Sequence, residues 1–434
     1  MSGLLRRHRD FRLLWCGETS GKFGAAVTGV ALPLIAVSTL RAGTFAVGLL
    51  AACSWLPWLL IGPPVGVWVD RVRRRPLMLA AAALSLALFT AVPLIAAAGG
   101  LGIGLLIVLA LLAGAAAVVF QTAYSAYLPG LLAPADLAEG NAALHGSASA
   151  AQIAGRGAAG ALIPWAGAAG GLFAQAAAFL VSVLCLLGIR HREPRPAAGP
   201  RSPRSLTAEV AAGLRLVARD PWFRPMTLFG AASNLALMGY QSLLPVFLVR
   251  EAGLTPGAVG GLLAVAGTGG LAGAFLARRA ADRFGTARAT LLCELVLPCP
   301  VLLIPLTSGG AGALLYVAGG FAVSAGVVAG NIIKAGFQQR RCPPDLLGRL
   351  TACAAFLNYG TLPLGALLGG ALGSLLGVRT AMWITTAGVP LAGLILLCSP
   401  VRRVRDLPGP GPAPAPGGTN IPTADGNHPA QPAG

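Results

Sequence analysis

Charged side chains are scarce in this sequence. Asp, Glu, Lys and Arg make up 11% of its 434 residues, whereas apolar residues make up 56%, and the mean hydropathy is +0.75. A soluble domain of this length would need far more polar side chains to cover its surface, so that class of protein is excluded. The composition instead predicts an all-α polytopic membrane protein whose main solvent is lipid.

Side chains that carry out catalysis or hold metals are also few. Of the four histidines only His145 lies near an apolar run, and a membrane enzyme would need nucleophiles, acids or ligands gathered at one face. The eight cysteines form no CxxC or Cys/His pattern, which indicates neither a metal site nor a disulfide framework. Glycine-rich stretches are not followed by Gly-Lys-Ser/Thr, so an ATP-driven pump is unsupported. We therefore expect no enzymatic activity, no metal and no cofactor.

Apolar runs long enough to cross a bilayer core, which takes about 20 residues, occur twelve times. Six precede the polar segment 190–224, at 14–38, 45–69, 77–98, 103–126, 142–165 and 172–189. Six follow it, at 225–249, 258–276, 289–306, 313–333, 351–376 and 381–398. The sequence therefore predicts a six-helix bundle over 1–189, a cytoplasmic linker over 190–224, a second six-helix bundle over 225–399 and a disordered tail over 400–434. Within the linker, apolar residues recur at helical spacing from Leu206 to Val217, which predicts an amphipathic helix on the membrane surface.

Basic residues indicate the orientation of the chain. With both termini in the cytoplasm, 26 of the 32 Lys and Arg residues lie on the cytoplasmic side, as the positive-inside rule requires. Arg41, Arg250 and Arg379 lie outside, and the other three, Lys22, Arg156 and Lys334, lie in or near apolar runs. Although the formal net charge is +18, these residues occupy short loops without interleaved aromatics, so we expect no nucleic-acid partner.

Several landmarks recur at nearly one offset. Asp70 and Arg71, at the end of the second run, are followed 212 positions later by Asp282 and Arg283. Three further echoes are 209 to 212 positions apart: Val47 with Val259, Asp10 with Asp220, and Asp136 with Asp345. Two copies of one unit, in the same order, are typical of secondary transporters.

The segment that joins the second and third runs contains Gly66, Asp70, Arg71, Arg74 and Arg75. Arginines beside a span can serve as topology anchors alone. An aspartate would weaken such an anchor, so we favour a latch, in which these charges bond a neighbouring helix in only one of two conformations. Asp282 and Arg283 would form its second copy.

These residues resemble the major facilitator superfamily over nearly the whole chain apart from the tail. The resemblance rests on Gly66-x-x-x-Asp70-Arg71-x-x-Arg74-Arg75, Asp282-Arg283-Phe284-Gly285, Phe11-Arg12-Leu13-Leu14-Trp15, Leu128-Pro129, Pro134-x-Asp136-Leu137 and Gln152-Ile153-Ala154-Gly155. The last four are similar to the branch that contains macrolide-efflux and enterobactin-export proteins. The sequence departs from the pattern at several positions: Arg73 stands where the loop motif has a small glycine, Arg278 occupies the position corresponding to Gly66, and Arg156 stands where that branch usually has proline. Ala25 replaces the acidic residue common in the first span, and the fourth span contains no arginine, so the proton-antiporter signature known there is absent.

The resemblance implies two six-helix bundles in a bacterial plasma membrane that rock about a central site, with the loop motif as a gate. It implies proton-coupled efflux of a small amphipathic molecule such as a drug, an antibiotic or a siderophore. Import of a small metabolite by the same fold is the alternative, and a channel would need a polar-lined pore or charged rings. The expected partners are a small-molecule substrate, protons and the lipid bilayer, and we expect a monomer.

Ionisable residues inside spans are costly, so they face water, face each other or serve function. Glu18 and Lys22 are one helical turn apart in the first run. One hypothesis makes Glu18 the proton-coupling group, and the other makes the two residues a self-satisfied ion pair near the interface. Both remain open.

Further polar residues in the runs are candidates for substrate contact. Arg156 could bind an anionic substrate or Glu18, but snorkelling to the headgroups is favoured. For Glu294 we expect a loop arginine as partner, and for Lys334 a role as an interfacial anchor. The remaining candidates could line a cavity or make ordinary interhelical hydrogen bonds: Gln121, Tyr124, Asn234, Tyr240 and Gln241.

Overall fold

The computed structural model describes residues 3–191, 193, 215, 217–342 and 344–409. Residues 63, 67, 70, 164, 166, 168, 169, 344–349, 351 and 352 are described by their backbone only. Ten helices in the described part are long and apolar enough to cross a membrane. Two further crossings come from a helix that is broken, at 44–71, and from the first part of a helix that is continuous with the next crossing, at 137–188. The result is the predicted all-α fold with twelve crossings.

The N-terminal half comprises the helices α1 to α7 and one π-helical turn, η1. Their bounds are α1 (Gly3–Arg7), α2 (Arg9–Leu34), η1 (Ile35–Thr39), α3 (Thr44–Leu60), α4 (Gly62–Arg71), α5 (Arg74–Ala97), α6 (Ile103–Leu131) and α7 (Leu137–Gly188). α3 and α4 form one crossing that is interrupted only at Ile61. The 52-residue α7 forms two crossings because Gly167 has φ 67° and ψ 174°, a backbone conformation that glycine adopts without strain and that breaks the helix.

The C-terminal half repeats this plan with the helices α9 to α15. Their bounds are α9 (Phe223–Val246), η3 (Phe247–Glu251), α10 (Pro256–Gly267), α11 (Gly269–Phe284), α12 (Thr286–Leu291), η4 (Leu292–Val296), η5 (Cys299–Leu306), α13 (Ala313–Arg341), α14 (Pro344–Leu376) and α15 (Val378–Leu397). The second crossing of this half is again divided, into α10 and α11. α12, η4 and η5 together make its third crossing.

The backbone confirms the internal repeat where the first crossing of each half ends. Pro33 and Pro245 are 212 positions apart, and each precedes a π-helical turn, η1 or η3, at the same offset. The loops that follow reverse at positive φ, 47° at Arg41 and 66° at Gly253, again 212 positions apart. The turns are also closed by equivalent hydrogen bonds, from Ala42 N to Ala36 O and from Leu254 N to Leu248 O. The two halves are therefore two copies of one structural unit.

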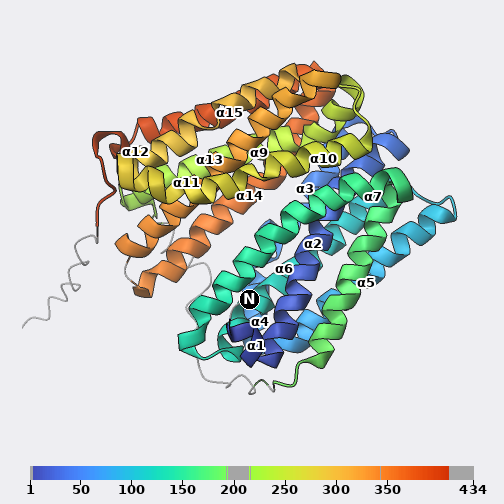
Figure 1. Cartoon of the computed structure of the whole chain (residues 1–434), viewed down its shortest axis with the longest axis horizontal. Coiled ribbons are helices and arrows are strands. Elements are labelled where there is room, and N and C mark those ends of the chain that lie inside the picture. The colour runs from blue at the N-terminus through green and yellow to red at the C-terminus, as the bar shows by residue number, and fades with distance from the viewer. Residues whose placement is uncertain (1–2, 192, 194–214, 216, 343, 410–434) are drawn as a thin grey trace, which may run out of the picture.

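The two halves lie side by side, and α3 packs along α14 while α7 packs along α10 (Figure 1). We call the side that carries the connections 72–73, 132–136 and 285 the basic face, and the side that carries 40–43, 98–102 and 252–255 the far face. The halves meet toward the far face and diverge toward the start of α7 and the start of α14 (Figure 1). One apolar core cluster contains residues of both halves, among them Val27 and Ile163 from one and Tyr240 and Phe247 from the other.

Glycines allow this close approach. A Cβ atom on Gly48 of α3 would lie 2.7 Å from the Cα atom of Gly370 on α14. A Cβ atom on Gly260 of α10 would lie 2.5 Å from the Cα atom of Gly160 on α7. Both separations are shorter than real side-chain contacts, so the helix backbones touch at these points, as small residues permit in membrane proteins.

The chain ends partly differ from the sequence-based expectations. Most of the expected surface helix, 206–217, and the tail from 410 lie outside the described residues. The tail was expected to be disordered from residue 400, but 400–407 are packed against the C-terminal half, so that expectation is wrong for this stretch. Val401 and Leu407 are buried, and Asp406 accepts a hydrogen bond from Thr286 N at 2.9 Å. The two apolar side chains anchor the segment against α12 despite its three arginines.

Candidate functional site

Glu18, Lys22 and Gln121 form a hydrogen-bonded group inside the N-terminal half. Glu18 and Lys22 follow each other by one turn on α2, and Lys22 Nζ lies 3.1 Å from Glu18 Oε1. The same Nζ donates to Gln121 Oε1 on α6 at 3.2 Å. The Glu18 side chain is 9% exposed and that of Lys22 is 36% exposed. A buried carboxylate is therefore joined to a cation that is partly exposed.

Tyr124 extends this group by one turn along α6. Its side chain is buried, stacks on Phe120 with ring centroids 6.5 Å apart, and interacts electrostatically with the Glu18 carboxylate. One turn of α2 and one turn of α6 thus bring together four of the residues that the sequence singled out.

Arg156 lies on the first crossing of α7 but reaches the other half. Its Nη1 atom is 3.0 Å from the place that a Cβ atom would take on Gly267 of α10. It interacts electrostatically with Tyr240 and Tyr316, both buried residues of the C-terminal half. The ion pairs found in the described part of the chain do not include it. Arg156 is therefore a cation at the interface between the halves, near Tyr240 and Tyr316, and within the described residues it forms no ion pair with Glu18.

The C-terminal candidates do not form a single cluster. Asn234 Nδ2 on α9 donates to the backbone carbonyl of Asn358 on α14 at 3.3 Å, which is an ordinary interhelical hydrogen bond. Tyr240 packs in the apolar cluster shared by both halves, and Gln241 is exposed. The amide oxygen of Asn358, a residue that the sequence did not single out, is buried and has no hydrogen-bond partner within the described residues.

An aromatic contact between the halves was missed from the sequence. Tyr359 of α14 lies against Trp55 and Trp58 of α3, with ring centroids 6.1 Å and 5.5 Å apart. Trp55 and Trp58 stand one turn apart on one face of α3, which is a signal that the sequence does contain. Their partner lies about 300 positions away in the other half, and no local pattern points to it.

Arg250 was also missed, since it counted only as one of three basic residues outside. Its Nη2 donates to Ala42 O at 2.7 Å and to Val37 O at 3.4 Å. Both acceptors lie where the first crossing of the N-terminal half ends, at the negative end of that helix, which favours a cation. Arg250 therefore links the two halves at the far face.

The arginines of the loop motif bond within their own half. Arg75 donates from Nε to Leu186 O and from Nη2 to Leu187 O, each at 3.0 Å. Glu193 accepts from Arg75 N at 3.0 Å and pairs with Arg74 at 3.7 Å. These contacts tie the start of α5 to the end of α7. The side chain of Asp70 lies outside the described part of the structure, so the latch stays a prediction.

Among the side chains that the structure describes, the remaining positions of the motif show no contact that would close a gate. Arg71 is exposed, and a Cβ atom on Gly66 would meet no atom within 4 Å. In the second copy, Asp282 pairs with Arg278 of its own helix at 3.8 Å, with both side chains largely exposed. Arg283 lies over the ring of its neighbour Phe284. The second copy therefore bonds along α11 in this conformation.

Two expectations about charged residues in the C-terminal half are wrong. Glu294 pairs with Lys334 at 2.6 Å rather than with a loop arginine, and Lys334 is mostly shielded within the bundle rather than anchored at the interface. Their side chains are 3% and 15% exposed, and Lys334 Nζ lies 4.7 Å from the ring centre of Phe229. Gly330 on α13 leaves the space that the Glu294 carboxylate fills. Because the two residues are 40 positions apart and lie on different crossings, no local sequence pattern indicates that they pair.

A fold of twelve crossings in two repeated halves, with charged residues inside the helices, is typical of membrane transporters. Residues 14–361 match the Major Facilitator Superfamily model, so the chain belongs to the major facilitator superfamily and is a multi-pass transporter rather than an enzyme. It is 26% identical over 417 residues to the multidrug efflux pump Tap of Mycolicibacterium fortuitum, covering 91% of this chain and 96% of that one. It is 28% identical over 405 residues to Tap of Mycobacterium tuberculosis, covering 88% and 92%.

Solved structures share the fold. A bacterial homologue of the iron transporter ferroportin in an inward-facing state superposes with a TM-score of 0.73 at 17% identity, covering 92% of this chain and 99% of that one. The nucleoside transporter NupG superposes with a TM-score of 0.71 at 12% identity, covering 90% and 98%. At these identities the likeness establishes the architecture alone.

Proposed function

We propose that this chain is a proton-coupled efflux transporter of small amphipathic molecules in a bacterial plasma membrane, with both termini in the cytoplasm. The observation that carries the proposal is the similarity to multidrug efflux pumps named Tap, which spans about nine tenths of the chain. The concentration of basic residues on one face supports the orientation, with the basic face in the cytoplasm and the far face outside.

Transport would proceed by alternating access between the two halves, 1–189 and 225–399. Three contacts between the halves, Gly48 with Gly370, Gly160 with Gly260 and Arg250 with Ala42, lie toward the far face. The polar contacts at the basic face, such as Arg75 with Leu186 and Arg341 with Asp220, join residues of one half. This asymmetry supports an inward-facing conformation, from which the far-face contacts would have to open.

Coupling would depend on Glu18. Its carboxylate is the buried acidic group of the cluster formed with Lys22, Gln121 and Tyr124, and a proton on Glu18 would remove the attraction to Lys22. Protonation would thereby change the charge that one half presents, and a change in charge can bias two conformations.

The test uses proteoliposomes with an imposed pH gradient and ethidium as a fluorescent amphipathic probe. Wild type should move ethidium against its gradient. Glu18→Gln should reduce pH-driven accumulation by about tenfold or more while leaving exchange down a concentration gradient intact, because a fixed neutral group cannot carry the proton. Glu251→Gln, on the far face, is the matched control.

Unchanged accumulation by Glu18→Gln would rule out this coupling role. Movement of ethidium in the import direction under the same gradient would favour the alternative of import.

The aromatic contact offers an apolar surface to an amphipathic substrate, because Trp and Tyr rings combine a large apolar area with a polar edge. We expect Trp58→Ala to raise the half-saturating ethidium concentration by about threefold to tenfold, the worth of one aromatic contact. Trp68→Ala removes an exposed tryptophan of α4 and should leave it unchanged. Equal effects of the two substitutions would show that the aromatic contact does not bind the substrate.

A further inference from the structure

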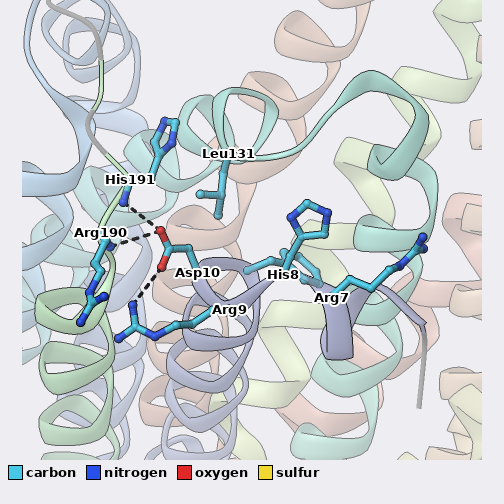
Figure 2. Close-up of a pocket in the computed structure, with 8 residues that line it drawn as sticks. Arg7, His8, Arg9, Asp10, Leu131, Arg190 and His191 are labelled. Atoms are coloured by element: carbon cyan, nitrogen blue, oxygen red, sulfur yellow. Dashed lines mark hydrogen bonds and ion pairs between the residues drawn. The ribbon is translucent and has the colours of Figure 1, made fainter.

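A basic pocket lies at the basic face of the N-terminal half, apart from the helix-embedded charges described above. Its volume is about 520 Å³, and it forms where α1, the start of α2, the end of α6 and the end of α7 meet. Its polar lining comprises Arg7, His8, Arg9, Asp10, Arg190 and His191. Figure 2 shows Arg9, Arg190 and His191 around Asp10, with His8 and Arg7 on the other side and Leu131 between.

The pocket has a fixed wall because α1 is anchored under the bundle. Leu4 and Leu5 are buried in the apolar core of this half. Leu4 N donates to Glu139 Oε1 at 3.1 Å, and His8 Nε2 lies 3.5 Å from Asp136 Oδ2. A short helix that buries both leucines leaves Arg7 at the rim of the pocket.

The charge of the pocket is not balanced from within. Its single carboxylate, on Asp10, accepts from the backbone N–H groups of Arg190 and His191 at 3.2 Å and 2.8 Å and pairs with Arg9 at 3.6 Å. Over the described ranges, the guanidinium groups of Arg7 and Arg190 have neither a hydrogen bond nor an ion pair. Two cationic side chains with five N–H donors each are therefore available to an anion.

The equivalent aspartate of the C-terminal half has a different partner from Asp10. Asp220 lies 210 positions after Asp10, and it receives a two-point contact from Arg341, at 3.2 Å from Nε and 2.9 Å from Nη2. Arg341 in turn lies 210 positions after Leu131. In the N-terminal half, the position of that arginine is thus taken by an apolar side chain that lines the pocket, and Asp10 is engaged by backbone groups instead.

We propose that this pocket binds the phosphate group of an anionic phospholipid of the leaflet at the basic face. Guanidinium groups match phosphate oxygens in two-point hydrogen bonds. The lining residues stand at the ends of membrane-crossing helices, which is the depth of the headgroups, and basic pockets at this position recognise anionic headgroups. The apolar side chain of Leu131 at the end of α6 gives the pocket a wall suited to a lipid rather than to a free ion.

The experiment uses the full chain purified in detergent. Native mass spectrometry and thermal unfolding are recorded with phosphatidylglycerol, with zwitterionic phosphatidylcholine and with inorganic phosphate. The variant carries Arg7→Gln and Arg190→Gln, and the control carries Arg402→Gln and Arg403→Gln, two exposed arginines of the same face outside the pocket.

Wild type and the control should retain phosphatidylglycerol in preference to phosphatidylcholine and gain thermal stability from it, with no gain from inorganic phosphate. The Arg7/Arg190 variant should bind phosphatidylglycerol about tenfold more weakly or worse, the usual scale for losing charge-assisted hydrogen bonds. Equal retention of the two lipids by wild type would overturn the proposal, whether or not the variant folds. Equal losses in variant and control would overturn it too, and stabilisation by inorganic phosphate alone would show a site for a free anion.

Discussion

Each half contains a Glu–Lys ion pair inside its helices, and the two pairs differ in how far they are exposed. In the N-terminal half the Lys22 ammonium group pairs with Glu18, donates to Gln121 and remains partly exposed. In the C-terminal half Glu294 is buried and Lys334 is mostly shielded, and the aromatic ring of Phe229 covers the ammonium group. Buried pairs of this kind repay their desolvation only while both partners are present. The first pair keeps part of its cation exposed, whereas the second holds α13 against the third crossing of its half.

Removal of one partner of the buried pair should be costly. We expect Lys334→Met to destabilise the protein by about 3–5 kcal/mol, because it leaves the Glu294 carboxylate buried without a counter-charge. Thermal unfolding in detergent measures the loss. Glu294→Gln combined with Lys334→Met should recover most of it, since no isolated charge remains. A double variant as unstable as the single one would show that shape, and not charge, holds the helices together.

At the scale of helices, the sequence predicted the number of crossings better than their ends. Apolar length alone identified the crossing that α14 makes, predicted from residue 351, but the helix begins at Pro344 because its polar first turns extend beyond the apolar run. The interruption of α7 at Gly167 and the division of α3 from α4 depend on backbone angles that hydropathy does not record. Contacts between helices, such as Tyr359 with Trp58 or Glu294 with Lys334, could not be predicted because the partners are far apart in the sequence.

The glycine contact between α3 and α14 leads to a prediction about how the two halves close at the far face. Gly48→Ala should weaken the packing of α3 on α14, because the new methyl group would lie 2.7 Å from the backbone of Gly370. We expect reduced ethidium transport at unchanged expression. Gly104→Ala on α6 is the matched control, since a Cβ atom there meets nothing within 4 Å. If both variants transport as wild type does, the α3–α14 backbone contact does not limit the cycle.

At the scale of the whole molecule, duplication determines the architecture. The 212-residue offset that was visible in Asp70 and Asp282 recurs in the prolines, the π-helical turns and the reversing loops that end α2 and α9. The sequence could not show which side of the interface is closed, because that depends on Arg250 reaching carbonyl groups more than 200 positions away. Two equivalent halves joined at one face are what alternating access requires.

The link made by Arg250 should favour the closed far face. Arg250→Gln removes both hydrogen bonds to the end of the first crossing, so we expect the population with an open far face to increase. Arg379→Gln is the control, because Arg379 pairs with Glu251 of its own half at 3.7 Å.

The most direct test of alternating access is a pair of distances measured by spin labels in one protein background without its exposed cysteines, Cys16, Cys299 and Cys398. One pair of labels, at Ala98 and Ser308, reports on the far face, and the other, at Ala135 and Gln339, reports on the basic face; all four residues are exposed. We predict that Arg250→Gln lengthens the first distance and shortens the second, while Arg379→Gln changes neither. Distances that stay fixed, or that change in the same direction, would contradict the rocking of two halves about a shared site.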